Sequence, residues 1–559
     1  MTESLPFAHL VVAPVLLPLA SAAIMLWLGE RRRTARAAIS LLSAVLGLAL
    51  AVYLLVQVDR SGDAAAFGVY LPGNWPVPFG IVLVADRLSA LMLVLSALIG
   101  LASLLFSLAR WDRAGVQFHP LLQLQLMGLN GAFLTADLFN LFVFFEVLLA
   151  ASYGLLLHGG GGARVRAGLH YIAINLFASL LFLIGVALLY GVTGTLNMAD
   201  IAQKLAHVPA SDRGLLHAGA AILAVAFLAK AAVWPLNFWL PPAYAAASTP
   251  VAALFAILTK VGVYAVLRLW TLSFPASAGD SALFGNDVLV WGGVITLAMG
   301  AIGMMASQHL GRLAAFSVIA SSGTVIAAIG FDHQGLTAGG LFYLASSTLA
   351  AAALFLLVEL MERARQSEVD APSPVPVERH LPSFAEAEPP QDVNLDDDEV
   401  ALIGRAIPAA VAFLGLAFML CTLVVAGLPP LSGFVGKVAM LSALLAMPAD
   451  HPSPVLGGGA LFVMLIVSGL LAALALTRVG IRHFWSPSDR QPPRVRIFES
   501  LPIALLLGSC IGMVIAGEPA LRYLGATAAA LHEPDRYIAA VLGARPVPSP
   551  PKVAEKGTP

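Results

Sequence analysis

Long apolar runs recur along this chain of 559 residues, and they limit its fold more than any other feature. The hydrocarbon core of a bilayer is ~30 Å thick, so a spanning helix needs about 20 consecutive apolar residues, a criterion that gives about fourteen spans here. Each run must be helical, because lipid offers no partner to an unpaired backbone amide. The sequence therefore predicts an all-α polytopic membrane protein with spans near residues 8–28, 36–57, 82–109, 120–136, 138–157, 167–191, 214–246, 250–270, 287–306, 310–330, 336–361, 402–446, 455–477 and 497–517.

Composition excludes the main alternatives to a membrane protein. Hydrophobic residues make up 59% of the chain and charged residues 11%, whereas soluble domains carry about 25% charged residues. The 31 basic and 32 acidic residues nearly cancel, which leaves no positive field to attract nucleic acid. Cys421 and Cys510 both lie in apolar runs, so a disulfide framework and a cysteine-rich metal site are excluded. No two histidines have the spacing of metal ligands, and we expect neither a metal nor a cofactor.

The arginines indicate how the chain lies in the membrane. Cytoplasmic loops carry an excess of lysine and arginine, and the loops after the odd-numbered spans hold 18 of the 31 basic residues. The even-numbered loops hold only Arg60, Lys204 and Arg213, with Arg268 at a span end. We therefore expect the odd-numbered loops to be cytoplasmic. Both termini are then expected on the outer, periplasmic side of a bacterial inner membrane.

The spans group into four parts. Residues 1–115 hold spans one to three, residues 116–272 a first unit of five spans, residues 285–480 a second unit of five spans, and residues 481–559 a basic cytoplasmic loop, span fourteen and a tail. Residues 363–401 are rich in proline, glutamate and aspartate, which indicates a cytoplasmic linker or a short surface helix. The tail after Glu518 is Pro-rich at its end and is expected to fray. Residues 200–205 predict a short amphipathic piece at the outer surface.

Four charged side chains fall inside apolar runs: Glu146, Lys230, Lys260 and Lys437. A charge in the middle of a membrane costs roughly 2.5–3.5 kcal/mol on insertion scales, so packing alone does not explain four of them. A structural salt bridge between Glu146 and one lysine is the alternative, but it leaves the other lysines unpaired. Desolvation makes an ammonium release its proton more readily, and a nearby carboxylate makes it hold that proton. These residue types therefore predict a proton relay with an electrostatic switch, for which the permanently charged arginine is unsuited.

Two of the predicted spans are interrupted beside a lysine. Pro235 follows Lys230 in span seven, and Pro429 and Pro430 precede Lys437 in span twelve. Proline lacks the amide that a helix needs, and its ring crowds the carbonyl four residues earlier. Broken helices at corresponding positions are the best sequence pointer to an inverted-repeat transporter. Because the two breaks lie an odd number of spans apart, the two five-span units are expected to have opposite topology.

Two other ionisable residues are weaker candidates for the relay. His309 lies at the cytoplasmic start of span ten, where a surface or capping role and a relay role both remain open. Asp137 stands at the start of span five and is a secondary candidate.

The residues around the buried charges resemble a known superfamily. The Phe-Phe-Glu run that ends at Glu146, the motifs Ala-Lys-Ala, Trp-Pro-Leu and Trp-Leu-Pro within 229–241, and Leu-Pro-Pro-Leu-Ser-Gly-Phe at 428–434 carry the resemblance. They are similar to the antiporter-like subunits of the Mrp cation/proton antiporters and of the membrane arm of respiratory complex I. The stretches 407–423 and 427–441, which follow an acidic linker, look most like the D-type subunit of the Mrp/Pha antiporter.

The resemblance implies a role for each buried charge. Glu146 and Lys230 match the charge pair of the family, Lys260 its central lysine, and Lys437 the terminal charge of its span twelve. The family fold it implies is a bundle with two inverted five-helix repeats, each containing a broken helix. The broken helices here are those interrupted at Pro235 and at 429–430.

The chain also departs from the family pattern in the second unit. Relatives often carry a lysine or histidine in span eleven and a histidine in span ten. This chain has Ser346 and Ser347 in span eleven and Ala-Ser-Ser-Gly at 320–323 in span ten. Hydroxyls and bound water are then the remaining proton route between Lys260 and Lys437.

The first expectation for function is a proton-translocating subunit of a multi-subunit antiporter that exchanges a monovalent cation, Na⁺ before K⁺, for protons. Such a chain is an ion transporter and not an enzyme. Its partners would be subunits of the A, C, E, F and G types, protons, monovalent cations and the lipid bilayer, without nucleic acid. The rival is a proton-pumping membrane-arm subunit of an NADH-quinone oxidoreductase or a membrane-bound hydrogenase. Neighbouring reading frames discriminate between the two, because small hydrophobic subunits favour the antiporter and flavin or iron–sulfur subunits favour the rival.

Overall fold

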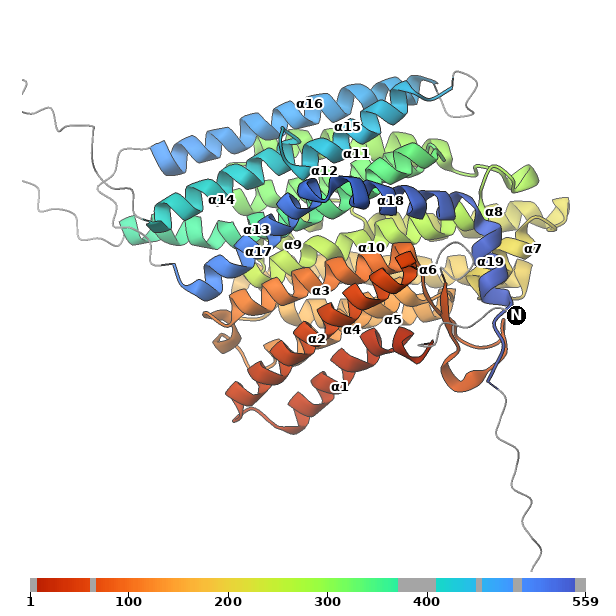
Figure 1. Cartoon of the computed structure of the whole chain (residues 1–559), viewed down its shortest axis with the longest axis horizontal. Helices are drawn as coiled ribbons and strands as arrows, with labels where there is room; N and C mark the ends of the chain where they lie inside the picture. The colour runs from red at the N-terminus through yellow and green to blue at the C-terminus, as the bar shows by residue number, and fades with distance from the viewer. Residues whose placement is uncertain (1–7, 61–66, 370–408, 449–454, 486–494, 548–559) are drawn as a thin grey trace, which may run out of the picture.

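The computed structural model describes residues 8–60, 67–369, 409–448, 455–485 and 495–547. In this part the chain forms a bundle of long helices that run in nearly one common direction (Figure 1). Twelve of the described helices are long and apolar enough to cross a membrane. Two shorter helices, α1 and α4, with 15 and 17 residues, complete the fourteen predicted spans. The all-α membrane fold is therefore confirmed.

The first part of the bundle runs from the N-terminus to the end of the eighth span. Its elements are η1 Ala8–Val11, α1 Ala13–Trp27, α2 Arg33–Arg60, β1 Gly68–Tyr70, η2 Pro72–Asn74, β2 Leu83–Ala85, α3 Arg87–Ser107, η3 Trp111–Arg113, α4 Phe118–Leu134, α5 Leu138–Leu156, α6 Gly162–Thr193, α7 Met198–Leu205, α8 Ala210–Lys230, α9 Leu240–Ala246 and α10 Thr249–Ser273. The two short strands pair antiparallel, with Val69 opposite Val84.

The second part holds the remaining spans and two helices after them. Its elements are η4 Gly279–Ser281, α11 Asn286–Ala306, α12 Leu310–Ile329, α13 Gln334–Val369, α14 Ala409–Ala426, α15 Ser432–Leu445, α16 Val455–Gly480, η5 Ile481–Trp485, α17 Ile497–Ile515, α18 Gly517–His532 and α19 Pro534–Leu542.

Three helices form the centre of the bundle. The most apolar stretches of α10, α12 and α13 are 94, 89 and 100% buried, whereas that of α2 is 28% buried. Close helix contacts support this core, because glycines let backbones approach. A Cβ added to Gly300 of α11 would lie 2.6 Å from the amide nitrogen of Ala320 in α12. A Cβ on Gly262 of α10 would lie 2.7 Å from the amide nitrogen of Ala231, just after α8.

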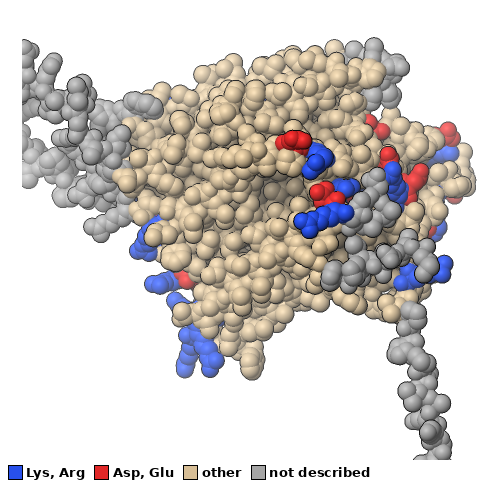
Figure 2. Space-filling model, viewed as in Figure 1, with Lys and Arg blue, Asp and Glu red and all other residues tan. Residues whose placement is uncertain are grey.

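The two ends of the bundle differ in charge. Arg110, Arg164, Arg312 and Arg363 line one cavity and define what we call the arginine-rich end. The N-terminus and α19 lie at the opposite end (Figure 1). On the face shown in Figure 2, a broad uncharged surface separates blue side chains at one edge from mixed blue and red side chains toward the other. An uncharged band between two charged ends is the surface that a bilayer requires.

Two expectations need correction, one for the C-terminal tail and one for the linker. Residues 518–542 do not fray, because α18 and α19 fold against the bundle, and the Tyr523 hydroxyl donates to the Arg87 carbonyl at 2.7 Å. The Pro-rich end of the tail, 548–559, lies outside the described residues. Residues 363–369 belong to the last turns of α13 and not to a linker. The remainder of the predicted linker, 370–401, lies outside the described residues. The short amphipathic helix is confirmed as α7.

Candidate functional site

The first broken span is interrupted directly after a lysine. Helix α8 ends at Lys230, and α9 begins only at Leu240. The break is secured by hydrogen bonds, since the indole of Trp239 donates to the Ala229 carbonyl at 3.1 Å and the Trp234 amide donates to Thr296 Oγ1 of α11 at 2.9 Å. A helix end inside a bilayer needs such partners for its free carbonyls and amides.

The Lys230 ammonium lies among aromatic and weakly polar groups. The side chain is 9% exposed. Its Nζ donates to Ser179 Oγ of α6 at 3.4 Å and lies 4.9 Å from the centre of the Phe145 ring. A small cavity of about 20 Å³ beside it is lined by Phe145, Tyr171, Asn175 and Trp239, among others. A cavity of this size accepts about one water molecule.

Glu146 does not form a direct ion pair with Lys230 in the described structure. Its oxygen Oε1 is buried and has no hydrogen-bond partner there. The carboxylate still acts electrostatically on the Lys230 ammonium. A buried acceptor without a hydrogen-bond partner is costly. A bound water or a movement of the side chain would give Oε1 of Glu146 a partner.

Lys260 is the most deeply buried of the three lysines. Its side chain is 1% exposed, on the central helix α10. Its Nζ donates to Ser321 Oγ at 2.9 Å and to Ser322 Oγ at 3.1 Å, both on α12. The ammonium is thus held by hydroxyls of the second five-span unit, although the lysine belongs to the first.

Hydroxyl groups continue from Lys260 toward the second broken span. Ser321 Oγ lies 2.7 Å from Ser347 Oγ on α13. The preceding residue of α13, Ser346, has its Oγ 2.7 Å from Ser432 Oγ, at the first residue of α15. Each of these hydroxyls can donate and accept a proton. Ser321, Ser347 and Ser346 therefore lie between Lys260 and the helix that carries Lys437.

The second broken span consists of α14 and α15. Lys437 belongs to α15, and its ammonium binds the C-terminal end of α14. Helix α14 ends at Ala426, and Lys437 Nζ donates to the Ala426 carbonyl at 3.0 Å and to the Leu465 carbonyl of α16 at 3.3 Å. The last carbonyls of a helix carry a partial negative charge that favours a cation.

Glycines make the room for this ammonium. A Cβ on Gly469 would lie 3.0 Å from Lys437 Nζ, and a Cβ on Gly427 would lie 2.6 Å from its Cδ. Gly427 also has a φ of +74°, which lets the chain turn at the end of α14.

The two secondary candidates lie away from this chain of groups. Asp137 stands before the first residue of α5 and accepts a hydrogen bond from the Asn140 amide at 2.8 Å, so it caps that helix. His309 precedes the first residue of α12 and is exposed at the arginine-rich end, where it lines the large cavity.

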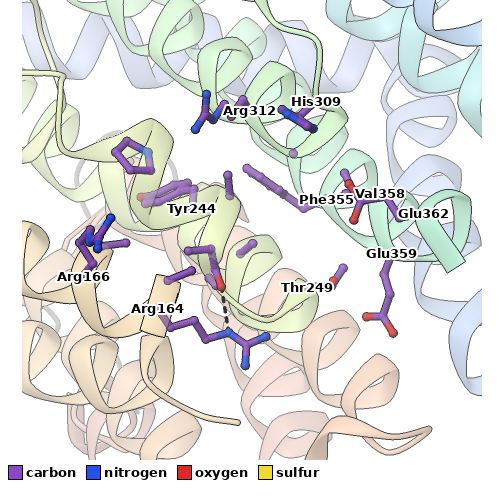
Figure 3. A pocket seen from close by; sticks show the side chains of 18 of the residues that line it. Arg164, Arg166, Tyr244, Thr249, His309, Arg312, Phe355, Val358, Glu359 and Glu362 are labelled. Atoms are coloured by element: carbon purple, nitrogen blue, oxygen red, sulfur yellow. Dashed lines mark hydrogen bonds between the residues drawn. The ribbon is translucent and has the colours of Figure 1, made fainter. Parts of the chain in front are cut away.

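The large cavity opens at the arginine-rich end between α6, α9, α12 and α13 and has a volume of about 820 Å³ (Figure 3). Its wall includes Trp239, the same residue that lines the small cavity beside Lys230. Tyr171 packs on that indole, with ring centres 5.4 Å apart. Trp239 is therefore a wall shared by the large cavity and the small cavity beside Lys230.

A buried ion pair at the opposite end was missed in the sequence. Arg268 was placed at a span end, but its Nη2 lies 2.7 Å from Asp86 Oδ2, with both side chains less than 10% exposed. Its guanidinium also lies over the rings of Tyr264 and Tyr537. The only signal in the sequence was local: Asp86 and Ser89 have the spacing of a capping box, which they form at the start of α3. A capping box does not indicate that Asp86 pairs with Arg268.

Comparisons with known proteins identify relatives of the chain. Residues 135–373 match the family model described as NADH:quinone oxidoreductase/Mrp antiporter, TM. The chain is 52% identical to the D-type subunit of a probable K(+)/H(+) antiporter of Rhizobium meliloti (strain 1021), over 96% of this chain and 98% of that protein. It is 33% identical to the D-type subunit of a Na(+)/H(+) antiporter of Alkalihalophilus pseudofirmus, over 96% of this chain and 99% of that protein.

A solved structure has the same fold over nearly the whole chain. A chain in the structure of the Mrp complex from Dietzia sp. DQ12-45-1b superposes with a TM-score of 0.79 at 26% identity, covering 96% of this chain and 100% of that chain. The relatives, which match over nearly their full length, and the matching fold together identify the family to which this sequence belongs. The chain belongs to the family of D-type subunits of the Mrp-type cation/proton antiporters, within the superfamily shared with NADH:quinone oxidoreductase.

Proposed function

We propose that this chain is the proton-translocating subunit of a multi-subunit monovalent cation/proton antiporter. Protons pass between Lys230, Lys260 and Lys437, and Glu146 sets the proton affinity of the first lysine. The observation that carries the proposal is the line of groups from Lys260 through serine hydroxyls to α15. In a membrane interior, polar groups in such a line are otherwise unfavourable, and they are typical of proton pathways.

The step from Ser347 to Ser346 is the one that needs movement or water. Both hydroxyls belong to α13, but each is bonded to a different neighbour, Ser321 and Ser432 respectively. Successive residues of a helix point about 100° apart, so a proton crosses between them when a hydroxyl rotates or a water bridges them. The same reasoning applies to Glu146, whose buried oxygen has no hydrogen-bond partner among the described residues, so a water or a side-chain movement is needed to link it to Lys230.

The orientation follows from charge. The arginine-rich end faces the cytoplasm, because basic loops stay on that side, and both termini lie on the outer side of a bacterial inner membrane. The large cavity then gives the Lys230 region access from the cytoplasm past Trp239. If the two five-span units are inverted repeats, Lys437 exchanges its proton with the outer side, since inversion exchanges the faces.

The exchanged cation and the partners are inferred from the relatives. The protein that is 52% identical is named a K(+)/H(+) antiporter subunit, which favours K⁺, and the one that is 33% identical is named a Na(+)/H(+) antiporter subunit. The superposed chain comes from an Mrp complex, so we expect further antiporter subunits of the A, C, E, F and G types as partners. Both full-length relatives are antiporter subunits, which supports this function over the rival in a quinone-reducing enzyme.

The test uses the complete complex in inverted membrane vesicles with an imposed pH gradient. Addition of K⁺ or Na⁺ should dissipate the gradient with the natural chain, and Glu146→Ala and Lys230→Ala should abolish that response while the complex assembles. The reason is that both changes remove the first relay site without adding a charge to the membrane. Normal exchange by both assembled variants would show that these residues are structural. An unchanged gradient with either cation in the natural complex would overturn the antiport function itself.

A further inference from the structure

The large cavity at the arginine-rich end carries an excess of positive charge. Five arginines and two glutamates line it: Arg110, Arg164, Arg166, Arg312, Arg363, Glu359 and Glu362. The excess is therefore three positive charges in one cavity. They come from segments far apart in the sequence, so the fold and not a basic run brings them together.

Two of the five arginines form ion pairs or hydrogen bonds within the protein. Arg363 forms ion pairs with Glu359 at 2.6 Å and with Glu499 at 2.7 Å. Arg164 donates to the carbonyls of Ala246, His158 and Gly160, the first of which is drawn as a dashed line in Figure 3.

The other three arginines, Arg110, Arg166 and Arg312, are exposed. Within the described ranges of the chain, no ion pair or side-chain hydrogen bond occupies their guanidiniums. They therefore supply up to fifteen N–H donors around one opening. Their common chemistry is that of a receptor for an anion with several oxygens.

The floor between these arginines is apolar. Tyr244 and Phe355 lie between Arg312 above and Arg164 below, with Arg166 at the left (Figure 3). Val358 and Phe238 extend this surface, and Phe238 is 56% exposed beside the first broken span. A free phosphate is not stabilised by contact with an apolar surface, whereas an acyl chain is, because the contact removes apolar surface from water. Basic pockets between helices on the cytoplasmic side are known binding places for anionic lipid headgroups.

This step rests on the proposed function. A positively charged cavity at the entrance of the proton route would oppose that function. Protons and monovalent cations are repelled by a positive field, and the field is strongest where low-dielectric walls focus it. Trp239 lines both this cavity and the small cavity beside Lys230. An anionic occupant removes the repulsion without closing the route.

We propose that this cavity binds one anionic phospholipid. The phosphate accepts hydrogen bonds from Arg110, Arg166 and Arg312, and an acyl chain lies along Phe355 and Phe238. The bound headgroup neutralises the entrance of the proton route. The site is therefore a lipid site with a direct effect on transport.

The binding test uses the purified complex, stripped of lipid and titrated with short-chain phosphatidylglycerol or phosphatidylcholine, followed by native mass spectrometry. The natural complex should bind phosphatidylglycerol in preference to phosphatidylcholine. In the double variant Arg166→Gln/Arg312→Gln, the affinity for phosphatidylglycerol should fall at least about tenfold. The matched control is Arg32→Gln/Arg33→Gln, since these arginines are exposed in a predicted cytoplasmic loop but do not line the cavity. It should bind as the natural complex does.

Several outcomes would overturn the proposal. Equal affinity in the cavity variant and the control would show that the lipid binds elsewhere. Full displacement of the lipid by inorganic phosphate would show a site for a free anion. A Cys introduced at Ala163, in the cavity wall, that resists a water-soluble thiol reagent even in the lipid-free complex would show that a neighbouring subunit fills the cavity.

The transport consequence is measured separately in liposomes. With the natural complex, exchange should be faster in phosphatidylglycerol than in phosphatidylcholine, and the cavity variant should lose this difference. A difference retained by the variant would contradict the neutralising role. No exchange by the natural complex in either lipid would refute the proposed function while leaving the binding result intact.

Discussion

The lysines inside this bundle are held by hydroxyls and carbonyls, and in the described part of the chain none of them has a carboxylate within ion-pair distance. Lys260 binds two serines, and Lys437 binds two backbone carbonyls. Such partners accept a hydrogen bond from the charged form but do not fix the charge as a carboxylate would. The residue types and their depth in the membrane were predictable, because a charge inside an apolar run stands out.

Their partners were not predictable from the same runs. The sequence around Glu146 is apolar on every side, so no periodicity indicates which face the carboxylate takes. Ser347 and Ser346 were recognised only as replacements for charged residues. Their hydrogen bonds join positions 26 and 86 residues apart, and contacts of that range depend on helix packing.

At this scale we predict that Ser346→Ala/Ser347→Ala slows cation-driven proton exchange about a hundredfold, the lower end of the range expected when a proton-transferring group is lost. Thr348→Val is the matched control, because this next residue of α13 bonds only to the Leu344 carbonyl of its own helix. Fluorescence quenching in vesicles measures the rate. Equal rates in the serine variant and the control would remove the hydroxyls from the route.

The two broken helices place their lysines at helix C-termini. Lys230 is the last residue of α8, and the Lys437 ammonium binds the last carbonyl of α14. The sequence predicted both interruptions, because proline disturbs the helix before it. It did not predict that α8 ends five residues ahead of Pro235, at the lysine itself. The position of the helix end depends on Trp234 and Trp239, whose hydrogen bonds reach α11 and back to α8.

At the scale of these elements we predict that Gly469→Ala impairs transport as a Lys437 substitution does. The added methyl would lie 2.6 Å from the Ala426 carbonyl oxygen and 3.0 Å from Lys437 Nζ, so it would displace the ammonium from the end of α14. Gly459→Ala, on the same helix and with no atom within 4 Å, is the control. Transport and complex assembly are measured together, and normal transport by Gly469→Ala would show that the site of Lys437 is not required.

At the scale of the whole molecule, helices α18 and α19, which follow the last span, cover part of the bundle near the end opposite the arginine-rich end. The tail after Glu518 is Pro-rich at its end, and this composition predicted a frayed segment. Instead, Tyr523 and Tyr537 are buried against the Arg87 and Arg268 region of the first part of the chain. Hydropathy predicts which segments enter a membrane, but it carries no signal for a contact between residues 87 and 523.

We predict that Asp86→Asn lowers the thermal stability of the complex in detergent by the equivalent of about 3–5 kcal/mol, because it leaves the buried Arg268 uncompensated. The exposed pair of Arg213 and Asp280 is the comparison, and Asp280→Asn should change stability by less than about 1 kcal/mol. Similar melting temperatures for the two variants would show that the buried pair does not stabilise this end of the bundle.

The central claim is that protons cross this subunit through Lys260, and one measurement tests it most directly. Cation-driven proton exchange is recorded in inverted vesicles that contain the assembled complex with Lys260→Ala, and Lys204→Ala serves as the control because Lys204 is partly exposed and pairs with Asp200 on α7. The account predicts loss of exchange with Lys260→Ala and normal exchange with Lys204→Ala, at equal amounts of complex. Normal exchange by Lys260→Ala would contradict it.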